Sequence, residues 1–200
     1  MRPFMTDRAT LASLEGQQYV VLRPAAEVGA FYAEEQRILL DRLPTGLPHP
    51  NTGHITLRGF AEPDRVDALR AAVRACAAAQ DPIEAVVEAI DGFPAPFQVL
   101  IARLRRSPAL TEAYASMTRA LESTDFERIG ELPLDDWVFH LSLVYCAALS
   151  DDDWRAHLRA SRRPVAPAPT ELISSAEFVW YAGGVEHVEV VPLGQGASLH

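Results

Sequence analysis

The sequence predicts a fold of mixed helices and strands that is built from two related halves. Runs of strand length, rich in β-branched and aromatic residues, alternate with longer segments of helical periodicity. Apolar residues make up 48% of the 200 residues, so the chain can bury a sizeable core without disulfides or metals. A pattern of His, apolar, hydroxyl and apolar residues occurs at 54–57 and again at 140–143, each time in a predicted strand that precedes a helix.

The first half of the chain is expected to begin with a strand at 17–24, which is β-branched and ends at Pro24. A helix is expected at 25–43, where apolar residues recur at roughly helical spacing, and Pro and Gly residues then mark a loop at 44–53. The rest of this half is expected to contain a strand at 53–60, a helix at 63–80, and strands at 83–90 and 97–104 that a hairpin-like connection joins.

The second half is expected to open with a helix at 107–123, because Ser107 can cap it and Pro108 suits its first position. Gly183-Gly184 near the end is a strong hairpin signal. The elements expected in between and around it are a loop (124–136), a strand (137–146), a helix (150–160), a Pro-rich connector (162–170) and two strands (171–182 and 185–193). We therefore expect one domain at 17–193, with an N-terminal extension at 1–16 and a C-terminal tail at 194–200.

Composition and charge limit the classes of function. The formal net charge of −9 argues against broad, non-specific binding to nucleic acid. Cys76 and Cys146 fit neither a zinc spacing nor a disulfide framework, so we expect buried thiols in a reducing compartment. The N-terminus has no apolar segment typical of a signal peptide, and no run is long and apolar enough to span a membrane. The sequence thus predicts a cytoplasmic protein.

The two matching tetrapeptides are the most specific signal in the sequence. On a strand, His54 and Thr56 share one face, and so do His140 and Ser142. Either histidine alone is explained most simply as a half-buried strand residue with a satisfied hydrogen bond. Two such tetrapeptides among six histidines arise by chance on the order of once in a hundred sequences of this composition, so the matched pair favours a shared function.

Two histidines on either side of a phosphate can divide the acid and base roles. One imidazole takes a proton from an attacking water or hydroxyl, and the other gives a proton to the leaving oxygen. The hydroxyls of Thr56 and Ser142 can hold the non-bridging oxygens while charge develops on them. No metal or cofactor is needed for this chemistry, and the remaining histidines form no ligand spacing.

The motifs His54-Ile55-Thr56-Leu57 and His140-Leu141-Ser142-Leu143 resemble those of the two-histidine (2H) phosphoesterase superfamily, and most closely its branch of 2′-5′ RNA ligases and RNA 2′,3′-cyclic phosphodiesterases. The resemblance implies a bilobal α+β fold, in which two pseudo-symmetric lobes of antiparallel sheet with outer helices surround a central cleft. It also implies hydrolysis of 2′,3′-cyclic phosphates to 2′-phosphates, with His54 and His140 as acid and base and Thr56 and Ser142 as phosphate holders.

The substrate side of the site is less specific. Arg58 follows the first motif on the His54 face, so we expect it either to contact phosphate or to be a solvated strand charge. Trp180 and Tyr181, beside the expected hairpin, are candidates to stack on a base, and Tyr145 is expected in the core. Family members often carry an arginine shortly after the second motif, and this chain does not, which leaves the substrate more open than the chemistry.

The expected partner is a nucleoside 2′,3′-cyclic phosphate or an RNA end bound by a monomer, without a long nucleic-acid footprint and without a membrane. Two alternative functions remain, besides a structural protein in which the motif pair is coincidental. The same residues would serve a 2′-5′ RNA ligase or RNA-end processor, which a larger basic surface beside the cleft would favour. A non-catalytic module that only binds nucleotides is the other, and two titratable imidazoles facing one phosphate count against it.

Overall fold

In the computed structural model, which describes residues 2–194, the strands form two antiparallel sheets of five strands each. The first sheet has the order β10-β9-β1-β2-β5, and in the second, β6-β4-β3-β7 lie in order while β8 also pairs with β3. The strands of the first sheet are β1 (Gln18–Leu22), β2 (Ile55–Phe60), β5 (Arg128–Ile129), β9 (Ser175–Ala182) and β10 (Val185–Pro192). Those of the second are β3 (Ile83–Phe93), β4 (Val99–Leu104), β6 (His140–Tyr145), β7 (Arg163–Pro164) and β8 (Thr170–Ile173).

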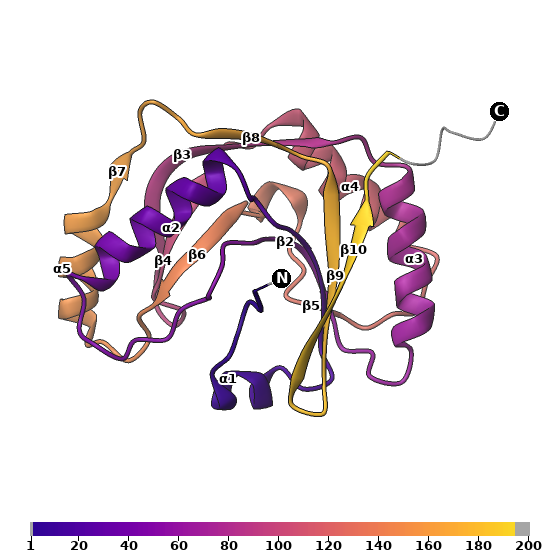
Figure 1. Ribbon diagram of the computed structural model, residues 1–200, viewed down its shortest axis with the longest axis horizontal. Coiled ribbons are helices and arrows are strands. Elements are labelled where there is room, and N and C mark those ends of the chain that lie inside the picture. The colour runs from indigo at the N-terminus through magenta and orange to yellow at the C-terminus, as the bar shows by residue number, and fades with distance from the viewer. Residues whose placement is uncertain (1, 195–200) are drawn as a thin grey trace.

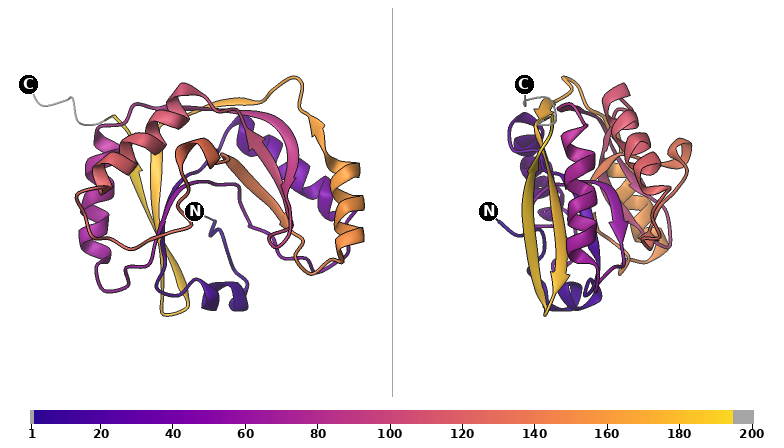
Figure 2. Two further views of the ribbon diagram at one scale, coloured as in Figure 1. Left: turned by 180° about the vertical axis from the view of Figure 1, so that it is seen from behind. Right: turned by 90° about the vertical axis from the view of Figure 1, so that its right-hand side faces the viewer.

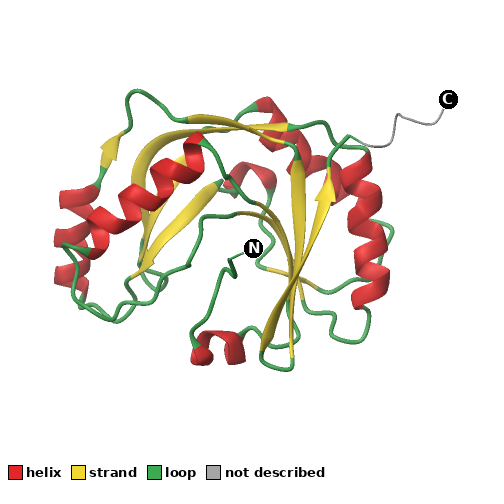
Figure 3. Cartoon of the chain, viewed as in Figure 1, coloured by secondary structure: helices red, strands yellow, loops and turns green. Residues whose placement is uncertain are grey.

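The longer helices lie on the outer sides of the two sheets (Figures 1 and 3). Helix α3 (Val66–Ala78) packs on β9 and β10, whereas α2 (Glu27–Leu40) and α5 (Asp151–Ser161) pack on the second sheet. Helix α4 (Pro108–Leu121) contacts both β2 and β3 and so joins the two sheets. We call the first sheet with α3 the first lobe, and the second sheet with α2 and α5 the second lobe. This arrangement confirms the expected bilobal α+β fold.

The lobes do not correspond to the two halves of the sequence. The first lobe combines β1 and β2 with β9 and β10 from the far end of the chain, and α2 from the first half packs on β6. The strand expected at 171–182 is in fact two strands, because residues 170–173 pair with β3 of one sheet and residues 176–180 pair with β1 of the other. Because each sequence half contributes elements to both lobes, the lobes share one continuous core, to which Ile55, Leu100 and Leu141 all belong.

The expected N-terminal extension is folded. Its short helix α1 (Arg8–Ser13) begins at an Asp7 cap, whose side chain accepts a hydrogen bond from the Thr10 backbone at 2.8 Å. Figures 1 and 2 show the segment from residue 2 to α1 lying between the two lobes, on the side opposite their outer helices. Within residues 2–194, no helix is long and apolar enough to cross a membrane. Cys146 is buried, Cys76 is half-buried, and both are free thiols.

Candidate active site

Helix α2 ties the two tetrapeptides together through buried polar side chains. The Gln36 amide donates to the carbonyl oxygen of Pro50, just before the first motif, and to that of Leu143 in the second, at 2.9 Å each. The Tyr32 hydroxyl donates to the carbonyl oxygen of Ser142 at 3.0 Å. Because each buried donor needs a partner, these bonds fix the position of one motif relative to the other. Motifs 86 residues apart in sequence are thus held at one place, where β2 approaches β6.

Both histidines are oriented by the same local device. Nδ1 of His54 lies 3.4 Å from the carbonyl oxygen of Thr52, and Nδ1 of His140 lies 2.8 Å from that of Val138, two residues earlier in each case. A carbonyl oxygen can only accept, so Nδ1 is the protonated nitrogen in both neutral rings. Nε2 is therefore the free, basic nitrogen of each histidine, as acid/base catalysis requires.

Each imidazole also packs against a phenylalanine ring. The Phe4 ring lies 4.5 Å from the His54 ring, and the Phe93 ring lies 4.8 Å from the His140 ring, both in T-shaped geometry. One phenylalanine comes from the N-terminal extension and the other from the end of β3. The two histidines therefore sit in similar apolar surroundings that unrelated parts of the chain provide.

These surroundings keep both histidines neutral in the free protein. The pKa of His54 is lowered to about 4, mainly by burial and to a smaller extent by the nearby charges of His140 and Arg23, whereas the hydrogen bond to the Thr52 carbonyl raises it. Burial also lowers the pKa of His140, which the Val138 carbonyl opposes. A charge on His140 disfavours a charge on His54, so the two rings belong to one electrostatic site.

A cavity of about 200 Å³ lies between the two lobes beside the motifs. His54 and Thr56 line it from the first lobe, and Ser142 and Tyr145 line it from the second. Three of the four residues expected to be catalytic thus line one cavity, whereas His140 does not line it, although its charge acts on His54. The remaining lining residues are Phe4, Met5, Leu14, Tyr19, Val21, Val179 and Tyr181.

A bulge in β2 places Arg58 away from this cavity. Consecutive residues of β1 pair with Thr56 and Arg58, so Leu57 is the extra residue and the side-chain alternation shifts after it. Arg58 is only 1% exposed and points to the helical side, with its guanidinium 3.5 Å from the centre of the Tyr114 ring and 3.4 Å from the Glu131 carboxylate. The expectation that Arg58 shares the face of His54 is therefore wrong, and we do not propose it as a phosphate contact.

A bulge at the equivalent position of β6 has the opposite effect on Tyr145. Consecutive residues of β4 pair with Val144 and Ser142, which leaves Leu143 as the extra residue. The shift turns Tyr145 to the face of Ser142, where it lines the cavity instead of joining the core. Burial raises its pKa to about 12, so its hydroxyl stays protonated and can donate a hydrogen bond. The expectation of a core tyrosine was wrong for the same reason as that for Arg58.

The two aromatic candidates of β9 lie on opposite faces of the sheet. Tyr181 lines the cavity, and its hydroxyl donates to Glu186 at 3.2 Å. Trp180 faces α3 instead, stacked on His187 at 5.0 Å and below the guanidinium of Arg70 at 4.9 Å. Since neighbouring strand residues alternate, only one of the pair can face a ligand in the cleft, and that residue is Tyr181.

The sequence did not indicate that residues of the N-terminal extension, or Arg23, belong to the site. Arg23 makes a two-pronged ion pair with Glu177, donates to Thr52 Oγ1, and lies over the Phe4 ring. The stretch Asp7-Arg8-Ala9-Thr10, a cap before an apolar run, is a sequence signal for the short helix. No local pattern indicates that Phe4 contacts His54.

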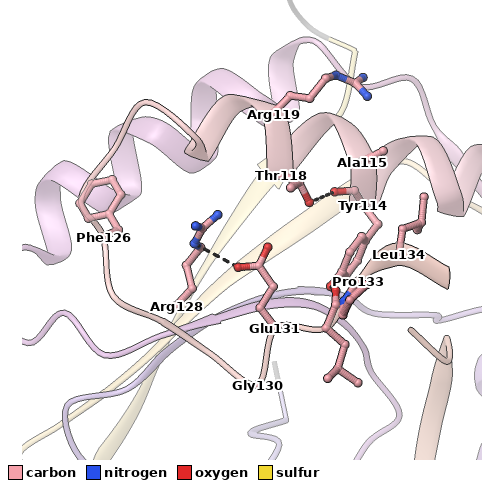
Figure 4. Close-up of a pocket in the computed structure, with 11 residues that line it drawn as sticks. Tyr114, Ala115, Thr118, Arg119, Phe126, Arg128, Gly130, Glu131, Pro133 and Leu134 are labelled. Atoms are coloured by element: carbon pink, nitrogen blue, oxygen red, sulfur yellow. Dashed lines mark hydrogen bonds and ion pairs between the residues drawn. The ribbon is translucent and has the colours of Figure 1, made fainter. Parts of the chain in front are cut away.

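A larger cavity lies outside the cleft, beneath α4 (Figure 4). It has a volume of about 800 Å³ and is lined by Tyr114, Thr118, Phe126, Arg128 and residues 130–134, among others. Glu131 projects into it and pairs with Arg128 at 3.0 Å. None of the catalytic candidates lines this cavity, so we assign the active site to the smaller one.

The comparisons with known proteins agree with this geometry. The family model described as the 2′-5′ RNA ligase superfamily matches residues 35–185. Among solved structures, TT0787 of Thermus thermophilus is 18% identical with a TM-score of 0.67, over 89% of this chain and 98% of that one. E. coli LigT complexed with 3′-AMP is 13% identical with a TM-score of 0.57, over 90% and 99%. Usb1 of Kluyveromyces marxianus is 12% identical with a TM-score of 0.53, over 90% and 100%. No curated protein matched the sequence.

Proposed function

Because the chain belongs to the 2′-5′ RNA ligase superfamily of two-histidine phosphoesterases, which supports an activity of phosphodiesterase or RNA ligase type, we propose that it hydrolyses 2′,3′-cyclic phosphates of nucleotides or RNA ends to 2′-phosphates. The observation that carries the proposal is the matched pair His54 and His140. Both rings donate from Nδ1 to the carbonyl two residues earlier and keep Nε2 free. E. coli LigT, a protein of the same fold, binds 3′-AMP, which fits a nucleotide ligand.

The reaction needs one base, one acid and a holder for charged oxygens. A water attacks phosphorus while the neutral Nε2 of one histidine takes its proton, and the bond from phosphorus to the 3′ oxygen breaks. The other histidine, protonated, gives its proton to that 3′ oxygen, so a 2′-phosphate and a free 3′-hydroxyl result. The hydroxyls of Thr56, Ser142 and Tyr145 donate to the non-bridging oxygens.

Because the pKa values of both histidines are lowered, the substrate itself helps to protonate the histidine that acts as the acid. In the free protein, burial disfavours the charged form of both His54 and His140. A bound phosphodiester anion is an opposite charge beside both rings and favours a proton on one of them. The cyclic phosphate thereby promotes the protonated histidine that its own cleavage requires.

The proposal is tested with purified protein and the four 2′,3′-cyclic nucleotides, in the presence of EDTA, with products identified by ³¹P NMR. We expect a 2′-phosphate product, and we expect His54→Ala and His140→Ala each to lower turnover by roughly 10²–10⁴-fold. His157→Ala is the matched control, because His157 lies on α5, away from the cleft.

Circular dichroism should show that all three variants are folded. Wild-type rates in both His54→Ala and His140→Ala would refute the assignment. Tight binding of a cyclic nucleotide by the folded wild type without any product would instead indicate a nucleotide-binding module. Ligation of RNA ends carrying a 2′,3′-cyclic phosphate and a 5′-hydroxyl, with the same dependence on the two histidines, would indicate the RNA ligase activity.

A further inference from the structure

The N-terminal segment covers the His54 side of the cavity. Phe4 is only 2% exposed, and its ring makes a T-shaped contact with the His54 ring. The guanidinium of Arg23 lies over the same phenylalanine at 3.6 Å and also donates to the carbonyl oxygen of Arg2 at 3.2 Å. A side chain outside both catalytic motifs is thus in direct contact with a proposed catalytic group.

Hydrogen bonds hold this segment at two places, on β10 and on the loop before β2. On the first lobe, the Glu186 carboxylate accepts from the backbone N–H groups of Phe4 and Met5, at 2.8 and 3.1 Å. In the loop between α2 and β2, the backbone N–H of Asn51 donates to the carbonyl oxygen of Phe4 at 2.7 Å, and its side-chain amide donates to Thr6 Oγ1 at 3.1 Å. One substitution at Glu186 removes both of its bonds to the segment, and it also removes the acceptor of the Tyr181 hydroxyl, so Phe4→Ala is needed as an independent variant.

The segment divides the space between the lobes into two cavities. The inner one, of about 200 Å³, contains His54, and an outer one of about 630 Å³ is lined by the loop that carries His49. Met5 and Tyr145 line both. Ligand sites usually have volumes of roughly 300–1,000 Å³. The inner cavity alone falls below that range, whereas the two cavities together fall within it.

We infer that residues 2–7 form a lid that restricts the size of the substrate, with Phe4 as a specificity-determining residue and Glu186 as its latch. The inference rests on the proposed function. With the lid closed, the inner cavity takes little beyond a cyclic phosphate and its ribose. With the lid open, the rest of a larger substrate extends into the outer cavity past Tyr145.

The experiment compares two substrates in the full-length protein, a 2′,3′-cyclic mononucleotide and a short oligoribonucleotide with a 2′,3′-cyclic phosphate end. We expect Phe4→Ala and Glu186→Ala each to raise the ratio of kcat/KM for the oligonucleotide to that for the mononucleotide by roughly tenfold or more. Glu189→Ala is the matched control, since that carboxylate lies on the same strand but pairs with Arg74 on α3. It should leave the ratio unchanged.

A second readout does not depend on turnover. Diethylpyrocarbonate reacts with neutral, accessible imidazoles, and peptide mass spectrometry separates the rate at His54 from that at His140. We expect Phe4→Ala and Glu186→Ala to raise the modification rate at His54, and Glu189→Ala to leave it as in the wild type.

The outcomes separate failure of the lid from failure of the proposed function. An unchanged substrate ratio with an unchanged His54 rate, in folded variants, would overturn the lid. If no protein turned over either substrate, the proposed function would fail, and the His54 rate alone would decide the lid: an increase in both lid variants would support it, and no increase would overturn it.

Discussion

Replacing Arg58 tests whether this residue stabilises the fold or takes part in substrate binding. Its guanidinium is buried between the Tyr114 ring and Glu131, and it also donates to the carbonyl oxygen of Tyr114 at 3.2 Å and to Thr118. Its Nε is buried without a partner, so the side chain is only partly satisfied. Arg58→Ala removes the cation–π contact and the ion pair and leaves a cavity, which together should cost about 3–5 kcal/mol of unfolding free energy.

Arg58→Met should behave differently, because it fills the volume and removes the buried charge. Its partner Glu131 is 24% exposed and keeps its pair with Arg128, so no isolated buried charge remains. We expect Arg58→Met to lose about 0–2 kcal/mol of unfolding free energy, which is less than the loss for Arg58→Ala. The larger loss in Arg58→Ala corresponds to a fall in Tm of roughly 10 °C. The exposed Arg119→Met on α4 is the control and should change stability by less than about 0.5 kcal/mol.

Thermal denaturation measures these differences, and kcat/KM on a cyclic nucleotide is measured well below each Tm. Neither Arg58 variant should lose activity there, since the guanidinium lies on the far face of β2 from the cavity. A loss of more than tenfold in folded Arg58→Met would refute this reasoning and return Arg58 to the substrate. Equal stability of Arg58→Ala and the wild type would show that the buried contacts contribute nothing.

Two further predictions follow from the surroundings of His54. The pKa of folded His54, about 4, lies below the ordinary imidazole value near 6.5, so the unfolded chain takes up this proton first as the pH falls. The contribution of His54 to the free energy of unfolding is therefore complete above pH ~6.5. It decreases by up to about 3 kcal/mol as the pH falls towards ~4. Urea titrations at several pH values should show this loss, and it should be smaller in His54→Gln; equal losses would contradict the assigned pKa. A Cβ at Gly53 would lie 2.8 Å from the Tyr32 ring, which is buried and hydrogen-bonded, so Gly53→Ala should lower stability by about 1–3 kcal/mol and also lower kcat as His54 shifts. Wild-type stability and turnover of that variant would show that the loop adapts at no cost.

Side-chain alternation in the sequence predicted the correct face for the residues before the bulges of β2 and β6, and the wrong face for the residues after them. Alternation correctly predicted that Thr56 and Ser142 lie toward one cavity, because both precede the extra residue of their strands. The same alternation failed for Arg58 and Tyr145, which follow it. A bulge is fixed by the pairing of a strand with its neighbour, and nothing within 53–60 or 137–146 shows where that pairing slips.

Long-range arrangement was likewise out of reach of local patterns. The run at 170–182 has uniform strand character, and its division between two sheets at Ser174 depends on strands about 85 and 155 residues earlier in the chain. Trp180 and Tyr181 are a different case, because alternation alone excludes that both face one ligand. The contact of Phe4 with His54 joins a terminal segment to a distant motif, and it became visible only once both lobes were assembled.

The site is symmetric in its chemistry and asymmetric in its access. Each motif has a histidine held by a carbonyl two residues earlier, a hydroxyl two residues later and a bulge after that, so equivalent groups approach a phosphate from both lobes. The second layer is not equivalent. Phe93 beside His140 belongs to a long strand of the second sheet, whereas Phe4 beside His54 belongs to a segment held by hydrogen bonds at its two sides. The His54 side can therefore open while the His140 side stays fixed, which places control of substrate entry on the first lobe.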